Sequence, residues 1–437
     1  MKFILSILLF YLFIGANVTS AQESHVKLEE QFKGSSVLPI IHYGFSLYDM
    51  DNDVHLFDIK GNQHFTPASN TKTYTLFSTL KHIGDSIPGI QYVERGDSLI
   101  FWGTGDPTFL HPKLDSHLVY NFLKASKKKL FYVAQSSAEP AYRNGWSIED
   151  YQEYYQPDIA TFPIYGNVVR IDVDSINGVK AIPSYFNQSF SKKEQIQPSF
   201  SVVRKQNANI FEYPSNVISR SLSIEKPFIW SDSLFVSLLQ DTLGVSINTL
   251  YEYNKPIDLK VIYSAPRNVV LREMMLPSDN FLAEHLTMLI SSAKYNGFYT
   301  DSLRKDMQKE YFSHFRDSII LRDGSGLSTY NKITPNNMVD LLLAIEKEVP
   351  DDDKRYLFFP AGGIDGTLRT AYELDNDEPF IWAKTGTVNS VHCQSGYIVT
   401  RQGRRLAFSF LNNNYMVPTS AIRKEMVRIM TFIRQNY

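Results

Sequence analysis

Ser69-Asn70-Thr71-Lys72 is the segment from which the architecture and the chemistry of this 437-residue chain can best be inferred. Two more short strings follow it along the chain, Ser278-Asp279-Asn280 and Lys384-Thr385-Gly386-Thr387, and each of the three strings occurs once. A serine three residues before a lysine arises by chance in many chains, so the first string alone is a weak signal. The three strings together, in this order, indicate the machinery of an acyl transferase with an active-site serine.

Ser69 and Lys72 have the spacing that a serine nucleophile and its base require. A serine hydroxyl is a poor nucleophile until a neighbouring base takes its proton, and positions i and i+3 of a helix lie on the same face. Thr66-Pro67-Ala68 and the helix-compatible residues after Lys72 predict a helix that starts at Ser69. Its N-terminus would direct free backbone N–H groups at developing negative charge. Lys72 can act as a base only with a lowered pKa, and we expect burial beside the positive charge of Lys384 to lower it.

The second and third strings lie in settings that suit substrate binding. Ser278-Asp279-Asn280 stands between two helical patterns and is typical of the turn before the second one. Lys384-Thr385-Gly386-Thr387 follows the apolar run Pro379–Ala383, which predicts a strand. A strand edge with a cation, two hydroxyls and a glycine offers a docking place for a carboxylate, because glycine permits close approach of the backbone. Taken singly, Ser278-Asp279-Asn280 is better explained as an ordinary helix N-cap, and the alternative for the Lys384 string is a lysine that protects an edge strand against aggregation.

Longer segments around the motifs resemble one family. They are Asp323-Gly324-Ser325-Gly326-Leu327-Ser328, the segment Gly362–Leu368, and Gly105-Asp106-Pro107-Thr108. With the three motifs, which are typical of penicillin-binding proteins and serine β-lactamases, they make the chain similar to the D-alanyl-D-alanine carboxypeptidase/endopeptidases. These are serine DD-peptidases, the low-molecular-mass class C penicillin-binding proteins. The resemblance runs from about Val37 to near the C-terminus and is weakest between roughly residues 110 and 260.

The resemblance implies four catalytic residues, Ser69, Lys72, Ser278 and Lys384. Ser69 would be the acylated nucleophile and Lys72 its base. Ser278 would carry a proton between the two lysines and the leaving group. The oxyanion hole would consist of the backbone N–H groups of Ser69 and Thr387.

The resemblance also implies the substrate-binding residues Asn280, Thr385, Gly386 and Thr387. Asn280 would hold the amide on the acyl side of the substrate, and the Lys384 motif would bind the terminal carboxylate. No cofactor and no active-site metal are implied. The sequence agrees, because it contains no H-E-x-x-H string, no C-x-x-C string and no nucleotide-binding glycine loop.

The N-terminal residues have the composition of a secretory signal peptide. Lys2 precedes the apolar run Phe3–Ile14, and Thr19-Ser20-Ala21 ends in small residues, so we expect cleavage after Ala21. No later apolar run approaches 18 residues, which predicts a periplasmic mature chain without a transmembrane anchor. The net charge of −2 provides no bulk attraction to nucleic acid. Cys393 is the only cysteine, so no intramolecular disulfide can form.

Both ends of the chain are expected to supply strands to one catalytic sheet. Residues 37–59 predict a β-hairpin, Gly396–Thr400 and Leu406–Leu411 predict another, and Ala421–Tyr437 predicts an amphipathic helix. The expected fold is α+β, a serine β-lactamase/transpeptidase-like domain with an antiparallel sheet flanked by helices. A large, mostly β insertion would interrupt it, shaping substrate access without adding a catalytic group. The expected divisions are a signal peptide over residues 1–21, a catalytic domain over 22–91 and 263–437, and the insertion over 92–262.

These observations predict a periplasmic serine DD-peptidase that acts on the stem peptides of peptidoglycan and is acylated at Ser69 by β-lactam antibiotics. It would cleave D-Ala-D-Ala termini, D-Ala cross-links, or both. A β-lactamase, an esterase, and a non-catalytic protein that binds the wall or senses β-lactams are alternatives that share the motifs. The long insertion favours the peptidase over a β-lactamase, and intact Lys72, Ser278 and Lys384 count against a loss of catalysis. The preferred diamino acid and the oligomeric state stay open.

Overall fold

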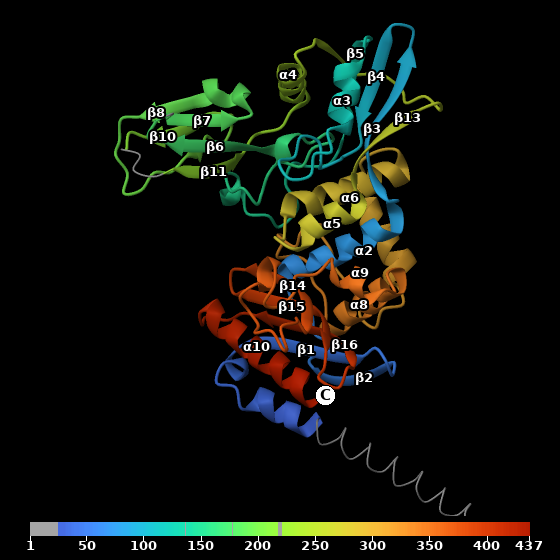
Figure 1. Cartoon of the computed structure of the whole chain (residues 1–437), viewed down its shortest axis with the longest axis vertical. Coiled ribbons are helices and arrows are strands. Elements are labelled where there is room, and N and C mark those ends of the chain that lie inside the picture. Colours follow the sequence, from blue (N-terminus) through green and yellow to red (C-terminus); the bar gives the residue numbers. More distant parts are fainter. Residues whose placement is uncertain (1–24, 136, 177, 217–220) are drawn as a thin grey trace, which may run out of the picture.

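The computed structural model describes residues 25–135, 137–176, 178–216 and 221–437. The signal peptide predicted over residues 1–21 lies outside these described residues. The described chain forms a part built from both of its ends and an insertion built from its middle; the insertion lies above the first part in Figure 1. The first part contains the three motifs and is called the catalytic part after the role expected of it. No helix in the described ranges combines the length and the apolar character needed to cross a bilayer.

A five-stranded antiparallel sheet of order β14-β15-β16-β1-β2 forms the centre of the catalytic part. The N-terminal hairpin joins the C-terminal strands where β1 pairs with β16, from His42 opposite Asn413 to Asp49 opposite Leu406. Both predicted hairpins are therefore present, and the two ends of the chain share one sheet. β14, at the edge of the sheet, carries the Lys384 motif. The strands are β1 (His42–Asp49), β2 (Val54–Ile59), β14 (Ile381–Val388), β15 (Val391–Val399) and β16 (Arg405–Asn413).

Helices cover both faces of this sheet. One face carries α10 and the helix over residues 25–33, and the other carries α2 and α8 (Figure 1). β16 has apolar side chains on both faces, which the helices cover. Phe408 and Phe410 pack in the cluster with α10, whereas Ala407 and Leu411 pack in the cluster with α2 and α8. A strand buried on both faces has a nearly continuous apolar sequence. The helices of the catalytic part include α2 (Lys72–His82), α5 (Arg267–Met275), α6 (Asn280–Tyr295), α7 (Thr300–Met307), α8 (Pro335–Glu348), α9 (Asp352–Tyr356) and α10 (Thr419–Asn436).

Two paired strands connect the catalytic part to the insertion. β3 (Ser86–Arg95) follows α2, and β13 (Lys260–Pro266) leads back into α5. The strands are antiparallel neighbours, with Lys260 opposite Tyr92, so the two ends of the insertion lie side by side. Each strand runs across one of the expected divisions, between residues 91 and 92 and between residues 262 and 263.

The insertion contains a five-stranded sheet of order β12-β5-β4-β3-β13 and two three-stranded sheets of order β11-β6-β7 and β8-β10-β9. Strands predominate in it, as predicted. α3 connects β4 to its parallel neighbour β5, and α4 precedes β12, which is also parallel to β5. The three-stranded sheets form the arm on the left of Figure 1. The bounds are α3 (Leu118–Ala125), α4 (Asp232–Leu243), β4 (Ser98–Gly103), β5 (Lys129–Val133), β6 (Val168–Asp174), β7 (Gly178–Ile182), β8 (Phe190–Lys193), β9 (Val203–Arg204), β10 (Phe211–Pro214), β11 (Leu222–Pro227) and β12 (Ile247–Leu250).

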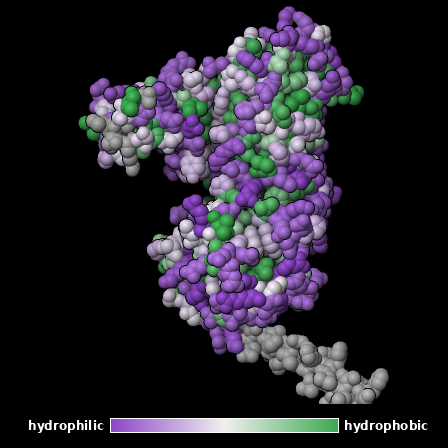
Figure 2. Space-filling model, in the orientation of Figure 1, coloured by the Kyte–Doolittle hydropathy of each residue, from purple (hydrophilic) through white to green (hydrophobic). Residues whose placement is uncertain are grey.

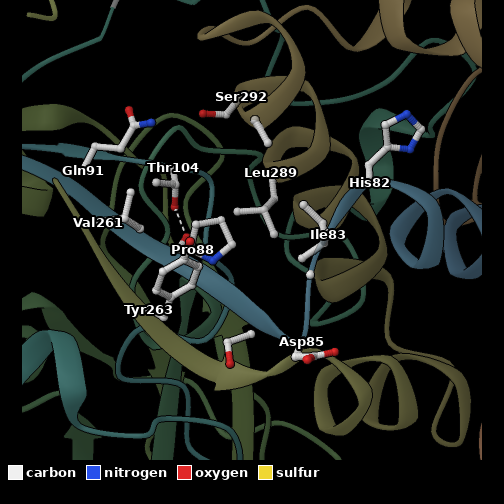
Figure 3. A pocket seen from close by; sticks show the side chains of 13 residues that line it. His82, Ile83, Asp85, Pro88, Gln91, Thr104, Val261, Tyr263, Leu289 and Ser292 are labelled. Carbon is white, nitrogen blue, oxygen red and sulfur yellow. Dashed lines mark hydrogen bonds between the residues drawn. The ribbon is translucent and has the colours of Figure 1, made fainter. Parts of the chain in front are cut away.

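The surface is hollowed where the two parts meet. Figure 2 shows a recess between the arm and the catalytic part, with hydrophobic residues scattered among hydrophilic ones. A separate cavity of about 590 Å³ lies where β3, β13 and α6 meet the end of α2. Pro88, Tyr263 and Leu289 lie around this cavity in Figure 3, and no described residue of its lining belongs to the three motifs. This cavity is therefore distinct from the candidate site.

Candidate active site

A tight turn places Ser69 beside Lys72. The 3₁₀ helix η2 (Ala68–Thr71) contains Ser69 and continues directly into α2, whose first residue is Lys72. The Lys72 Nζ atom donates a hydrogen bond to Ser69 Oγ at 3.0 Å. Ala68, just before the serine, has a φ of +48°, a left-handed conformation that is uncommon outside glycine. The structure thus brings together the two side chains that the spacing predicted to share a face.

Lys72 is enclosed by acceptors. Besides Ser69, its ammonium group donates to Asn280 Oδ1 at 2.6 Å and to the backbone carbonyl of Ser325 at 2.7 Å. Burial lowers the pKa of Lys72 to about 8, and the nearby carboxylates oppose this shift. Burial was expected to lower this pKa and is its dominant cause, whereas Lys384, the other expected contributor, is not among the causes. The lowered pKa that a base at position 72 requires is therefore present.

A second serine–lysine pair lies opposite the first. Asp279 caps α6 by accepting a hydrogen bond from the backbone N–H of Leu282 at 2.8 Å, which leaves Ser278 in the turn with a φ of +68°. Lys384 Nζ donates to Ser278 Oγ at 2.8 Å. Burial, followed by the charge of Lys72, holds the pKa of Lys384 well below its usual value. Among the hydrogen bonds of the described residues, none joins Ser278 to Lys72. The pairs Ser69–Lys72 and Ser278–Lys384 are therefore not hydrogen-bonded to each other through these two side chains.

The edge strand β14 passes close to the backbone of Ser69. An ideal Cβ atom built on Gly386 would lie 2.6 Å from the backbone nitrogen of Ser69 and 2.8 Å from the carbonyl oxygen of Pro67. Thr385 Oγ1 donates to Thr367 Oγ1 at 2.6 Å. Thr387 Oγ1 hydrogen-bonds His392 Nδ1 at 2.7 Å, and burial lowers the pKa of His392 to about 3, so this imidazole is neutral. Glycine at position 386 therefore allows the strand edge to approach the Ser69 backbone.

Replacing Gly386 by alanine is expected to push β14 away from Ser69. The new Cβ atom would meet backbone atoms of Pro67 and Ser69, which cannot move aside as the end of a flexible side chain can. We expect the rate of Ser69 acylation by a fluorescent penicillin to fall at least about tenfold, since small displacements at a reacting centre are costly. Gly84→Ala is the matched control, because an ideal Cβ there meets nothing within 4 Å. Equal acylation rates in the two variants would show that this close approach is unimportant.

The motif residues open into a cavity of about 960 Å³. Its wall includes Tyr154 and Tyr155 of the insertion, and the Asn280 amide donates to the backbone carbonyl of Tyr155 at 2.9 Å. The insertion therefore contacts a motif residue. The other described residues of the lining come from every part of the site: Ser69, Asp150, Pro277, Ser278, Asn280, Gly326, Leu327, Thr367, Leu368, Thr370, Ala371, Thr385, Thr387, Val388, Asn389, His392, Gln394, Ser420, Arg423, Lys424 and Val427.

Two buried carboxylates that sequence reasoning missed hold the segment 323–328 beside Lys72. Asp323 accepts hydrogen bonds from the backbone N–H groups of Gly326 at 2.9 Å and Ser328 at 2.6 Å. Glu284 accepts from the backbone N–H groups of Gly324 at 2.9 Å and Ser325 at 2.7 Å. The sequence contained a sign of the role of Glu284, because this charged residue lies within the mostly apolar segment 281–286. Glutamate is rarely buried without a partner, so a buried partner could have been predicted.

These contacts place a buried lysine within hydrogen-bond distance of a serine at the edge of the sheet, an arrangement typical of enzymes with a serine nucleophile. Within the described ranges, no three His, Cys, Asp or Glu side chains gather as metal ligands. A sequence model of the D-Ala-D-Ala carboxypeptidase 3 (S13) family matches residues 27–434, and the chain belongs to this family. The family inferred from the motifs is thereby confirmed.

Individual relatives agree with this assignment. The chain is 30% identical over 182 residues to D-alanyl-D-alanine carboxypeptidase DacB of Haemophilus influenzae, an alignment that covers 40% of this chain and only 37% of that protein. It is 22% identical over 420 residues to penicillin-sensitive carboxypeptidase A of Dictyostelium discoideum, covering 82% of this chain and 80% of that protein. The structure of penicillin binding protein 4 from Haemophilus influenzae superimposes with a TM-score of 0.74 at 20% identity, over 93% of this chain and 99% of that one. This likeness confirms the predicted fold class.

Proposed function

We propose that the protein is a serine DD-peptidase that cleaves D-Ala-D-Ala termini or D-Ala cross-links of peptidoglycan stem peptides. The observation that carries the proposal is the 3.0 Å contact between Ser69 Oγ and a buried Lys72. Neutral Lys72 accepts the Ser69 proton as Oγ bonds to the scissile carbonyl carbon. The C–N bond then breaks, the amine leaves with a proton, and water hydrolyses the resulting ester. β-Lactams form the same kind of ester at Ser69.

The second pair supplies a route for the leaving-group proton. Ser278 Oγ lies 2.8 Å from Lys384 Nζ and lines the cavity together with Ser69. A substrate between Ser69 and Ser278 can receive its proton from the Ser278 hydroxyl, which is replenished by a lysine. The backbone N–H groups of Ser69 and Thr387 then stabilise the oxyanion.

The remaining motif residues orient the substrate. Asn280 takes the acyl-side amide, and Lys384 with Thr385, Gly386 and Thr387 takes the terminal carboxylate. We also propose that the mature chain acts in the periplasm, after removal of residues 1–21. In this proposal, residues 22–91 and 263–437 form the catalytic domain and residues 92–262 form the accessory domain.

Mass spectrometry of purified muropeptides after digestion tests the proposal. We expect loss of D-alanine from pentapeptides, conversion of cross-linked dimers to monomers, or both. Steady-state turnover of penicillin without muropeptide cleavage would instead identify a β-lactamase. Hydrolysis of simple esters with no cleavage of D-Ala-D-Ala would identify an esterase, and the absence of all three activities would identify a binding protein.

Amidation of the terminal D-alanine is expected to reduce the efficiency of D-alanine release about tenfold or more, because a charge-assisted contact with Lys384 is lost. In Lys384→Ala the acid and the amide should be cleaved at similar, low rates. The measurement is kcat/KM for the paired substrates. Equal cleavage of acid and amide by the unmodified protein would show that the motif does not bind the carboxylate.

A further inference from the structure

We propose that Arg143, supplied by the insertion, is a positioning residue for acylation, acting through Glu284 on the loop that meets Lys72. This inference rests on the proposed function of Ser69 and Lys72. Arg143 lies in the insertion, which the sequence predicted to shape substrate access without adding a catalytic group. It does not touch Ser69, and its influence passes through contacts that the structure specifies one by one.

The first contacts join the insertion to α6. The guanidinium Nε of Arg143 donates to Glu284 Oε2 at 3.3 Å. The side chains of Arg143 and Glu284 are 3% and 2% exposed, so the pair is shielded from water. The guanidinium also pairs with Glu139 of the insertion and contacts Met288 Sδ at 3.6 Å.

The next contacts run from Glu284 to the base. Glu284 Oε1 accepts the backbone N–H groups of Gly324 and Ser325 at 2.9 and 2.7 Å. The carbonyl of Ser325 in turn accepts from Lys72 Nζ at 2.7 Å. One oxygen of the carboxylate thus binds the loop and the other faces Arg143, so Arg143 fixes the orientation in which Glu284 holds the loop.

Two more contacts tie the same loop to the insertion. Trp146 Nε1 donates to Asp323 Oδ2 at 2.9 Å, and Ser328 Oγ donates to the backbone carbonyl of Asn144 at 2.7 Å. Arg143, Asn144 and Trp146 are therefore one short segment of the insertion that contacts the loop beside Lys72. Replacing the insertion by a linker would remove all of these contacts.

Charge balance makes Arg143 the critical member of this segment. Burial raises the pKa of Glu284, the charge of Asp323 raises it further, and Arg143 opposes both effects. A buried carboxylate that loses its partner is costly, because its charge is no longer compensated. The charged and titratable groups around Lys72 and Glu284 come from every neighbouring element: Lys72 of α2, Asp279, Glu284 and His285 of α6 and its cap, Asp323 of the loop, Lys384 of β14, and Arg143 and Glu139 of the insertion.

Removal of Glu284 and removal of Arg143 should shift the pH dependence of acylation in opposite directions. The charge of Glu284 raises the pKa of Lys72, so Glu284→Gln should let Lys72 lose its proton at lower pH. Arg143→Met removes the positive partner of Glu284. The two backbone N–H groups that donate to Glu284 Oε1 remain and favour its ionised form from pH 6 to pH 10, so Lys72 should keep its proton to higher pH. The double variant removes one charge of each sign and should return to the behaviour of the unmodified protein.

The experiment measures the rate of Ser69 acylation by a fluorescent penicillin from pH 6 to pH 10 in the full chain. For Arg143→Met we expect the midpoint of the pH profile to rise by about one unit and the rate at pH 7 to fall roughly tenfold. For Glu284→Gln we expect the midpoint to fall. Arg143→Met/Glu284→Gln should recover to within about threefold of the unmodified rate, and Arg143→Lys, which keeps the charge, should lie between the extremes.

Arg204→Met is the matched control. Arg204 is another fully buried arginine of the insertion, and it donates to the backbone carbonyls of Tyr151, Lys205 and Gln206. Its loss should lower thermal stability without moving the midpoint. An unchanged midpoint in both Arg143→Met and Glu284→Gln, or a double variant no faster than Arg143→Met, would overturn the inference. If Arg143→Met does not fold, Arg143→Lys and Glu284→Gln decide the outcome. Failure of the unmodified protein to be acylated would instead refute the proposed function.

Discussion

A chain with alanine at position 69 is expected to take up no fluorescent penicillin, whereas the unmodified protein becomes labelled. Ser69 Oγ is the atom that would form the ester, and alanine has no atom to replace it. The fold should persist, because the one side-chain hydrogen bond that Ser69 makes among the described residues is with Lys72. Labelling on a denaturing gel and the intact mass of the labelled protein provide the measurement.

Ser390→Ala is the control for this loss. Ser390 lies in the turn between β14 and β15, near the site, and the one side-chain hydrogen bond that its hydroxyl donates within the described ranges goes to the neighbouring Asn389. It should be labelled like the unmodified protein. A folded Ser69→Ala protein that still forms a covalent adduct would mean that another residue is the nucleophile.

Lys72→Ala is expected to slow acylation by roughly 10²–10⁴-fold, the usual scale for loss of a general base. Lys72→Arg separates proton transfer from charge, because a guanidinium retains the positive charge and several donors but does not act as a base at these pH values. If Lys72 is the base, both variants should be slow, with circular dichroism confirming that each is folded. Near-normal acylation in Lys72→Arg would mean that the residue supplies only positive charge.

The assignment of Lys72 as the base also predicts how the acylation rate of the unmodified protein depends on pH. Lys72 must be neutral to accept a proton, and burial lowers its pKa to about 8. The acylation rate should therefore rise about tenfold per pH unit below pH 8 and level off above it, since the neutral fraction follows the same course. A rate that does not change between pH 6 and pH 9 would contradict this role, and a stopped-flow measurement with a chromogenic β-lactam can detect it.

Local patterns predicted much of the catalytic part. The alternation and length of apolar runs indicated β1, β2, β15, β16 and α10, because these elements bury faces that their own sequences define. The Lys384 motif lies within β14, where the run before it predicted a strand. Ser69 and Lys72 are neighbours because helix geometry alone brings positions i and i+3 together.

Contacts between distant segments could not be predicted in this way. The insertion was expected to shape substrate access without adding a catalytic group. Its individual contacts were not foreseen: Trp146 binds Asp323 of the loop beside Lys72, Tyr155 binds the motif residue Asn280, and Arg143 binds Glu284. Arg143 and Glu284 are 141 positions apart in sequence, and no local period links them. α3 in the insertion likewise joins the parallel neighbours β4 and β5, and β12, which follows α4, is also parallel to β5; this pairing depends on tertiary structure rather than on the local sequence.

The pairing of β1 with β16 has a consequence for the order in which the molecule is made. β1 ends at Asp49, and its partner β16 begins only at Arg405. In a growing chain, β1 therefore stays without its partner β16 until almost the whole chain has been synthesised. Only then can the catalytic sheet close. Such distant pairing slows folding, since a large loop must be ordered before its contacts form. The insertion, whose core lies within one continuous stretch, can fold earlier and bring Ser86 and Pro266 together, ready for the last strands.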